Sequence, residues 1–457
     1  MNRQNNFEQK SGNKFIPRSH GRGSVLGVFD MIRQIASAKK GMFVLGFCWV
    51  ASLWGDVKEV HAMNLTAPFY LENPLVLPPG VKNPRFSNIF MSIESKFNSA
   101  GQAEPLGNAL NKRIKWSEIV NAQKRHSEKS MIRSALNDLG LSYDGSPGSS
   151  TGTVNTYFNV KAPVLAVGIS ERFTLAVAVP VMDIAISADT GFIKSPDGQA
   201  FTNKICNLSV DQCNAAAKKL NNPINQKLSD LGYAPIQSTT ISSIGDIQVV
   251  GKYLLHKDDE NMLTLKSTLV LPTGIAPNAN LALDIPTGDG RFQLGEALVY
   301  GRELGSDFRL NAVSGIMALL PNEMQKRIPT AYGDPLSKDQ ELLTRNLGAS
   351  FALGTSVNHT FPSMGLVTAA GYNFQFMTKP SYSVGTYSPE RYTYLEDLTP
   401  VQALHSATLM AGFSTVEWYK AKKFVYPFQA NIVLSHPILG RNVTTNDVYS
   451  GELVLFF

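Results

Sequence analysis

The residues most able to bind ions or ligands are charged and amide side chains that recur at every second position of several segments. In an extended chain, residues two apart share one face, so each segment would present a polar row opposite an apolar one. Rows of mixed charge can form a ladder of internal salt bridges or a selectivity filter, and the spacing is compatible with both. The candidate residues are Asp246, Gln248, Lys252, Lys266, Arg309, Asn311, Asn373, Gln375 and Glu452.

Other arrangements that could carry chemistry are few. Cys206 and Cys213 enclose the polar segment NLSVDQ, with no nearby His to complete a metal site, so in an exported chain they predict a small disulfide. The sequence contains no nucleophile elbow, phosphate-binding loop, HExxH motif or metal-ligand pair. It therefore predicts no catalytic residue, no metal site and no cofactor.

The elements that must position the polar rows are β-strands. Leu263 and Leu265 alternate with Thr264 and Lys266, and the same period of two recurs along the chain. We expect twelve strands, at residues 86–97, 153–169, 173–187, 243–256, 262–272, 290–302, 307–319, 344–358, 363–377, 403–418, 425–436 and 447–457.

The connections between these strands alternate in length. Short links such as KDDEN at 257–261 alternate with long ones such as 98–152 and 188–242. Transmembrane β-barrels have short periplasmic turns, long outer loops and an even strand number, whereas a sandwich has no reason to alternate. We therefore predict an all-β, antiparallel barrel in the outer membrane of a Gram-negative bacterium, with both termini periplasmic. Its expected surroundings are outer-membrane lipids and lipopolysaccharide.

The last strand carries a further indication. Tyr449, Leu453, Leu455 and Phe457 fall on one face, and the chain ends in the aromatic Phe457. This pattern resembles the terminal-strand signal that the barrel assembly machinery selects, so we expect that machinery to be a partner.

Residues 1–62 have the pattern of a secretory signal peptide. The apolar run 42–55 follows Lys39 and Lys40, is too short to span a bilayer as a helix and precedes a small-residue cleavage site ending at Ala62. An uncleaved anchor helix is the alternative. The basic lead is longer than a signal needs, so we expect translation to begin at Met31 or Met42.

The net charge of +6 does not indicate a nucleic-acid partner. Most of the positive excess lies within residues 1–62, and the remainder of the chain is close to neutral. A nucleic-acid-binding surface requires a concentrated basic face. We therefore expect no nucleic-acid partner.

Two segments are expected to lie outside the barrel wall. Residues 63–85 contain five prolines and cannot pair as an inner strand, so they are predicted to form a plug in the lumen. Residues 105–139 have loosely helical spacing. Their basic run KRHSEK is either a solvated face or a contact with lipopolysaccharide phosphates.

Pro163 and Pro180 fall in neighbouring predicted strands. Proline removes a ladder hydrogen bond, so together they predict a bulge or inward kink in the wall. The alternative is that each proline occupies a position that needs no ladder bond.

One enzymatic interpretation follows from a barrel of this size. Outer-membrane phospholipases place a His and a Ser on the lipid side of the outer rim, and His405 with Ser406 is the nearest candidate pair here. The Asn and Gly that surround the His-x-Ser signature of that family are absent from this sequence.

Three segments carry a family resemblance. APVLAVGISERFTLAVAVPV (162–181), KSTLVLPTGIAP (266–277) and LPPGV (77–81) resemble outer-membrane transporters of the phenol-degradation-pathway family, relatives of the long-chain fatty-acid transporter superfamily. The resemblance covers most of residues 75–457. It implies passive diffusion of small hydrophobic or aromatic ligands through a plugged barrel, with the wall kink as a lateral exit. The Asn-Pro-Ala signature of the fatty-acid transporters is absent.

We therefore expect a non-enzymatic outer-membrane channel for small hydrophobic or aromatic compounds. The alternative is a structural or adhesive surface barrel that acts through its long outer loops.

Overall fold

The computed structural model describes residues 71–122, 126–208, 223–305 and 307–457, all within one compact unit. The predicted signal peptide, residues 63–70 of the predicted plug and Cys213 lie outside these ranges, as does the beginning of the KRHSEK run. The predicted disulfide between Cys206 and Cys213 therefore stays a prediction.

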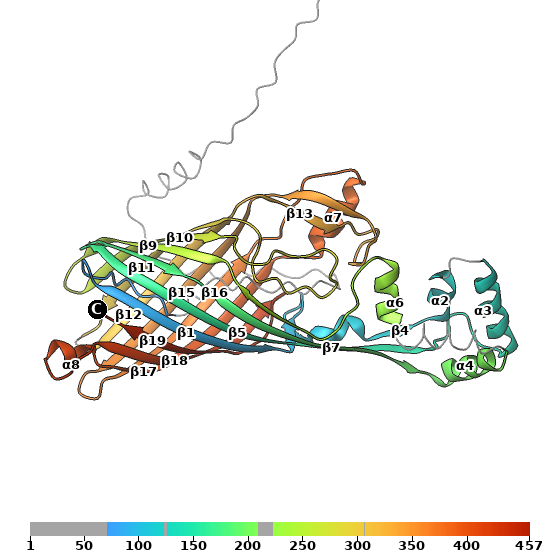
Figure 1. The fold of residues 1–457 in the computed structure, drawn as a ribbon, viewed down its shortest axis with the longest axis horizontal. Coiled ribbons are helices and arrows are strands. Elements are labelled where there is room, and N and C mark those ends of the chain that lie inside the picture. Colours follow the sequence, from blue (N-terminus) through green and yellow to red (C-terminus); the bar gives the residue numbers. More distant parts are fainter. Residues whose placement is uncertain (1–70, 123–125, 209–222, 306) are drawn as a thin grey trace, which may run out of the picture. The chain divides into compact units, whose positions relative to one another are not determined.

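The strands close into a twelve-stranded antiparallel barrel, as the alternating links predict (Figure 1). β1 pairs with β19 on one side and with β5 on the other, which completes the ring and leaves no open edge for lipid to satisfy. The ring consists, in order, of β1 (Lys82–Ile93), β19 (Val448–Leu455), β18 (Phe428–Arg441), β17 (Gln402–Ser414), β16 (Leu366–Met377), β15 (Gly348–Phe361), β12 (Phe308–Leu319), β11 (Gln293–Glu303), β10 (Asn261–Leu271), β9 (Ile247–Lys257), β6 (Phe173–Ala178) and β5 (Gly148–Ser170).

The wall starts earlier than the sequence predicts. β1 begins at Lys82, so residues 82–85 of the predicted plug belong to the first strand. Pro84 is tolerated there because it lies near the end of the strand, where few ladder bonds remain to be lost.

Two of the predicted strands are interrupted at the same height of the wall. β6 ends at Ala178 and the chain continues as β7 (Val181–Lys194), while β8 (Thr239–Ile244) is separated from β9 by Gly245 and Asp246. Pro180 lies in the first interruption, and its carbonyl accepts a hydrogen bond from Gly245 N at 2.8 Å. Pro163 lies within the continuous strand β5.

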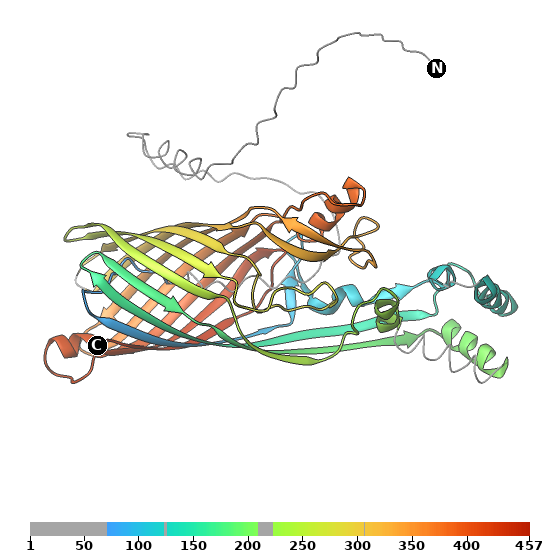
Figure 2. The same ribbon diagram turned by 45° about the horizontal axis from the view of Figure 1, so that its top comes forward.

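The long connections gather at one end of the barrel, and α8 and the C-terminus lie at the other (Figure 2). β5 and β7 extend toward the helices of the first two long loops. The loop elements are β2 (Ser95–Phe97), β3 (Ala103–Pro105), the 3₁₀ helix Leu106–Leu110, β4 (Lys112–Ile114), α2 (Trp116–Ala122), α3 (His126–Asp138), α4 (Pro196–Leu208), α6 (Pro223–Asp230), β13 (Asn322–Arg327), β14 (Gln340–Arg345), α7 (Pro389–Asp397) and α8 (Val416–Lys420).

The prediction of one helical stretch at 105–139 is wrong in its first third. Residues 112–114 form β4, which pairs with the extension of β5, so backbone hydrogen bonds to that strand replace helical ones. Beyond them, α2, α3 and α4 enclose a small hydrophobic core of their own around Trp116, Val120 and Phe201.

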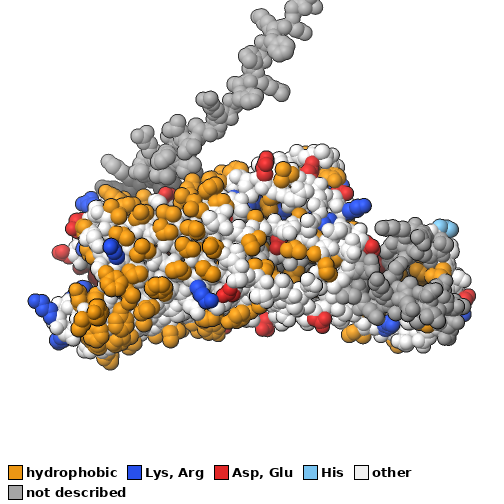
Figure 3. Space-filling model, in the orientation of Figure 1, with side chains coloured by type: hydrophobic (Ala, Val, Ile, Leu, Met, Phe, Trp, Pro, Cys, Tyr) orange, Lys and Arg blue, Asp and Glu red, His pale blue; other side chains and the backbone are white. Residues whose placement is uncertain are grey.

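The outside of the barrel carries an apolar belt. Exposed and buried residues alternate along β11. Leu294 and Leu298 are exposed, whereas Ala297 and Val299 face inward and are buried. Figure 3 shows hydrophobic side chains gathered over the wall toward the end that bears α8. Aromatic rings also cluster at this end, where Trp418 packs near Phe413. An apolar outer belt bordered by aromatic residues is the surface that a transmembrane barrel presents to lipid.

Among the described residues, no helix is both long and apolar enough to cross a bilayer.

Candidate functional site

The residues that precede β1 contact the inner face of the barrel wall. Leu77 N donates a hydrogen bond to Thr174 Oγ1 of β6 at 2.7 Å, and Thr264 of β10 donates to the carbonyl of Pro74 at 2.5 Å. Both threonines are almost completely buried, on the face opposite Leu175 of β6 and opposite Leu263 and Leu265 of β10. Residues 71–81, called the lumen segment below, are therefore held inside the barrel by backbone and side-chain hydrogen bonds.

The lumen segment also forms an ion triad with the wall. The two carboxylate oxygens of Glu72 lie 2.5 Å from Lys252 Nζ of β9 and 2.5 Å from Lys266 Nζ of β10. All three side chains are only 14–17% exposed. Lys252 Nζ also donates to the carbonyl of Asn73 at 2.8 Å. The triad therefore connects the segment to two neighbouring strands.

The two lysines require an anion between them. Lys252 and Lys266 are direct partners in the pairing of β9 with β10, and like charges directly opposite each other destabilise a sheet. Burial alone raises the pKa of Glu72, but attraction from the two ammonium groups outweighs it, so its pKa lies well below the ordinary value of 4.5. Glu72 is thus an ionised carboxylate that neutralises the pair.

Because the pKa of Glu72 is lowered, we predict that the lumen segment stays docked when the pH falls from about 8 to about 5. A carboxylate with a depressed pKa keeps its full contribution above its ordinary value, near pH 4.5, and loses it only as the pH falls through the lowered one. Single-channel conductance should therefore be constant between about pH 5 and pH 8. A rise between pH 6 and pH 5 would show that a different titrating group controls the segment.

Glycines in the wall make room for the lumen segment. A Cβ atom added at Gly168 of β5 would lie 1.9 Å from the carbonyl oxygen of Pro78, and one at Gly301 of β11 would lie 2.6 Å from Pro74 Cγ. Neither distance is compatible with the segment in its present position. The lumen segment and the wall are therefore fitted to each other.

Gly301→Ala should loosen the segment without unfolding the barrel. The new methyl group meets the ring of Pro74 rather than wall backbone, so displacement of the segment relieves the clash. We expect a higher conductance and faster proteolysis within residues 71–81. Gly451→Ala is the matched control, because its Cβ would meet no atom within 4 Å. Equal conductance in the two variants would contradict this account of Gly301.

The predicted polar residues occupy several separate places. Gln248, Asn311 and Asn373 are buried on the inner face, and Gln375 lies on that same face of β16. Asp246 lies instead in the interruption between β8 and β9, where it accepts hydrogen bonds from backbone N–H groups of the loop after β10.

The remaining inner charges form local pairs. Arg309 donates to Glu303 of the adjacent strand, and Glu452 accepts hydrogen bonds from Ser87 and Asn431. Of the predicted residues, Lys252 and Lys266 are the two that contact the same side chain, the carboxylate of Glu72. The sequence analysis did not predict a role for Glu72. The available signal was an acidic residue in the predicted plug together with two lysines predicted to face the lumen.

On the loop side of the triad, the inner wall carries an apolar cluster flanked by amide side chains, because Gln248 and Gln293 are the register partners of Val270. Ala297 of β11 is the register partner of Lys266, and Val270 follows Lys266 on the same face of β10, nearer the outer loops. Val270 packs with Met317 and Leu319, and all three are buried. A compound that enters from the loop end would therefore pass both apolar and amide side chains before it reached the triad.

The candidate phospholipase pair is not assembled. Ser406 is buried and pairs with the inward-facing Asn373. His405 lies on the lipid side, where its Nδ1 is 2.5 Å from the hydroxyl of the exposed Tyr372 and its ring packs on Phe374. His405 and Ser406 thus face opposite sides of the wall and cannot act as a base and its nucleophile.

The last strand presents the predicted aromatic face to the outside. Tyr449, Leu453 and Phe457 are exposed, while Leu455 is partly buried. The backbone of Phe457 exchanges two hydrogen bonds of 2.9 Å with Lys82, which extends the seam between the last strand and the first.

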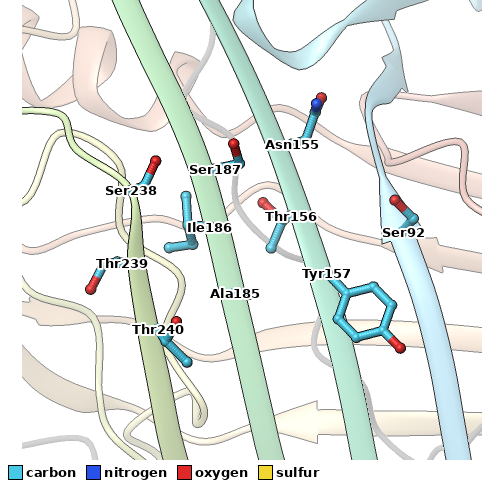
Figure 4. A pocket seen from close by; sticks show the side chains of 10 residues that line it. All are labelled: Ser92, Asn155, Thr156, Tyr157, Ala185, Ile186, Ser187, Ser238, Thr239 and Thr240. Carbon is cyan, nitrogen blue, oxygen red and sulfur yellow. The ribbon is translucent and has the colours of Figure 1, made fainter.

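A separate hollow of about 490 Å³ lies on the outer side of the wall where β1, β5, β7 and β8 meet (Figure 4). Its lining includes Ser92, Tyr157, Ser187 and Thr240, and every lining residue is uncharged. The hollow therefore offers hydroxyl and apolar contacts and no group suited to acid–base chemistry.

No protein-family model matches the sequence, and no curated protein matches it. Solved structures with which the chain shares some similarity include the COG4313 outer membrane channel from Pseudomonas putida F1, at 10% identity and a TM-score of 0.46, with 84% of this chain and 97% of that chain covered. They also include the Ralstonia pickettii toluene transporter TbuX, at 8% identity and a TM-score of 0.35, with 88% and 98% covered. A Pseudomonas aeruginosa FadL homologue gives 8% identity and a TM-score of 0.31, with 89% and 99% covered. At these values, the assignment of a transmembrane barrel rests on the strand pairing and the apolar belt of this chain.

Proposed function

We propose that this chain is a bacterial outer-membrane channel through which small hydrophobic or aromatic compounds diffuse passively, without catalysis or a cofactor. The observation that carries the proposal is a closed barrel whose inner wall carries an apolar cluster on its loop side and which holds a lumen segment by Glu72. A barrel that served only as a support for outer loops would have no need of this arrangement.

The lumen segment is the element that would restrict flow. Its backbone bonds to β6 and β10, together with the Glu72 triad, place it across the inner faces of adjoining strands. The contacts of residues 71–79 are not part of the ladder between wall strands, so these residues can leave the wall without unfolding the strands that hold them. In this proposal the lumen segment is a removable plug.

The wall interruption supports a lateral route for hydrophobic compounds. Pro180 and Gly245 face each other there with a single backbone hydrogen bond. Thr273 of the loop after β10 donates to the carbonyl of Gly245 and accepts from Ile247 N, so that loop bridges the break. Movement of this loop would be required before a compound could leave through the wall.

The test is solute flux through purified protein in liposomes. Swelling should be measured with 2-phenylethanol as a neutral aromatic probe, for the intact protein and for a variant that lacks residues 63–79, which leaves β1 complete. Faster swelling with the deletion variant supports the plugged channel. Absence of flux from both proteins, each shown to be folded by heat-dependent electrophoretic mobility, would overturn it.

The outer loops support the second candidate, an adhesive surface barrel. Two of the long connections build a core of their own, with Met324, Leu343, Tyr392 and Leu395 packed between the β13–β14 hairpin and α7. Organised loops of this kind can present a fixed surface to a partner.

The two candidates are separated by removing α2 and α3. Trp116 N donates to Gly145 O at 3.0 Å, so residues 116–145 can be replaced by a short glycine linker. Lost attachment of cells with unchanged flux favours the adhesin, and unchanged attachment with altered flux favours the channel.

A further inference from the structure

The lysine pair that holds Glu72 has the construction of a ligand site. Lys252 and Lys266 each contact a different oxygen of the same carboxylate at 2.5 Å, which is two-point recognition of one carboxylate group. Both side chains are mostly buried, so the contacts are formed in a region with little water. Any carboxylate of similar size that reached this position could accept the same hydrogen bonds.

Two other charged residues of the lumen already have partners in the wall, and the inner-face Arg85 of β1 adds positive charge near Lys252. Arg309 is engaged by Glu303 of its neighbouring strand. The carboxylate of Glu452 is held by neutral donors, Ser87 and Asn431. In contrast to Arg309 and Glu452, the Lys252–Lys266 pair takes its counter-charge from a segment that is not part of the wall.

The surroundings of the pair indicate what else the ligand carries. Ala297 lies opposite Lys266 in the strand pairing, and Val270, Met317 and Leu319 continue the inner face toward the outer loops. A ligand with its carboxylate at the lysines would direct the rest of its body along these side chains. Gln248 and Gln293 lie on either side of Val270, so that body would have an apolar part that meets Val270, Met317 and Leu319 and room for a polar group beside it.

We propose that Lys252 and Lys266 form a carboxylate-binding site that Glu72 occupies when the lumen segment is docked, and that amphipathic monocarboxylates displace Glu72 from it. This inference rests on the proposed channel function and assigns a substrate class to it. The exchange replaces one carboxylate by another, so the two ammonium groups keep a counter-charge throughout. The ligand and the docked segment then compete for the two lysines, and each weakens the binding of the other by the same factor.

The test uses phenylacetate and its neutral counterpart 2-phenylethanol, with affinities measured by isothermal titration calorimetry on the full-length protein in detergent. Phenylacetate should bind Glu72→Gln at least tenfold more tightly than it binds wild type, because the internal competitor is gone. Binding of 2-phenylethanol should be the same in both proteins. Acetate, which lacks the apolar body, should bind Glu72→Gln more weakly than phenylacetate does.

Two further variants assign the effect to the site. Adding Lys252→Met to Glu72→Gln should abolish the preference for phenylacetate over 2-phenylethanol. Glu452→Gln is the matched control, since it removes a lumen carboxylate that contacts neither lysine, and its affinity for phenylacetate should equal that of wild type. If Glu72→Gln does not fold, Glu72→Asp serves in its place, because the shorter side chain reaches the two lysines less well.

The outcomes separate this inference from the proposed function. Equal phenylacetate affinity in wild type, Glu72→Gln and the double variant would overturn the carboxylate site, even if liposomes swell in 2-phenylethanol. Absence of swelling with either solute would overturn the channel itself.

Discussion

Glu72→Gln is expected to release the lumen segment and to raise single-channel conductance. The substitution leaves Lys252 and Lys266 opposite each other without the carboxylate that neutralises them. Removal of one partner from a buried ion pair costs about 3–5 kcal/mol, and the partial exposure of this triad favours the lower end. A loss of about 3 kcal/mol shifts the docked-to-undocked ratio by roughly a hundredfold.

Two measurements check this prediction. Conductance in planar bilayers reports the open lumen, and the rate of proteolysis within residues 71–81 reports undocking. The triple variant Glu72→Gln, Lys252→Met, Lys266→Met is the matched control, because it removes the repulsion together with the carboxylate and should restore much of the docking. Conductance that stays at the wild-type level in Glu72→Gln would show that the backbone contacts of the segment suffice to hold it.

Arg327→Met is expected to disorganise the outer loops while the barrel stays folded. Arg327 is 6% exposed, and its guanidinium donates to the carbonyls of Ala279, Leu231, Ser337 and Gly232, which belong to three different loop regions. Loss of these hydrogen bonds would leave several buried carbonyls without a donor, at a cost of about 3 kcal/mol or more.

Limited proteolysis of the loops checks this second prediction. Cleavage between residues 223 and 345 should accelerate at least tenfold, while the heat-dependent mobility of the barrel is unchanged. Lys326→Met is the control, since the neighbouring side chain points to the other side of β13. Equal cleavage of the two variants would mean that the loops are held by their apolar core and not by Arg327.

The sequence was informative where one face of a strand meets lipid and the other meets the lumen. That alternation predicted all twelve wall strands and the inner position of Lys252 and Lys266, because a slip of one residue would reverse both faces. The interruptions at Pro180 and Gly245 were harder to foresee. A proline shows where a ladder bond is lost, but the break in the facing strand depends on how that strand and a distant loop respond.

The parts that the sequence did not reveal have no repeating pattern. The lumen segment is neither helix nor strand, so periodicity could not place Glu72 against two lysines far along the chain. The loop at 105–139 contained helical spacing, yet pairing of residues 112–114 with β5 overrode it in the first third. In both cases the structure is decided by contacts between distant segments.

The seam between the first and last strands also constrains the order of folding. Phe457 pairs with Lys82, so this seam joins the first and the last strand of the barrel and cannot close until β19 has been made. The lumen segment is attached directly to β1, at the same seam. The segment bonds to β6, β9 and β10, so its docking likewise waits until these later strands have been made.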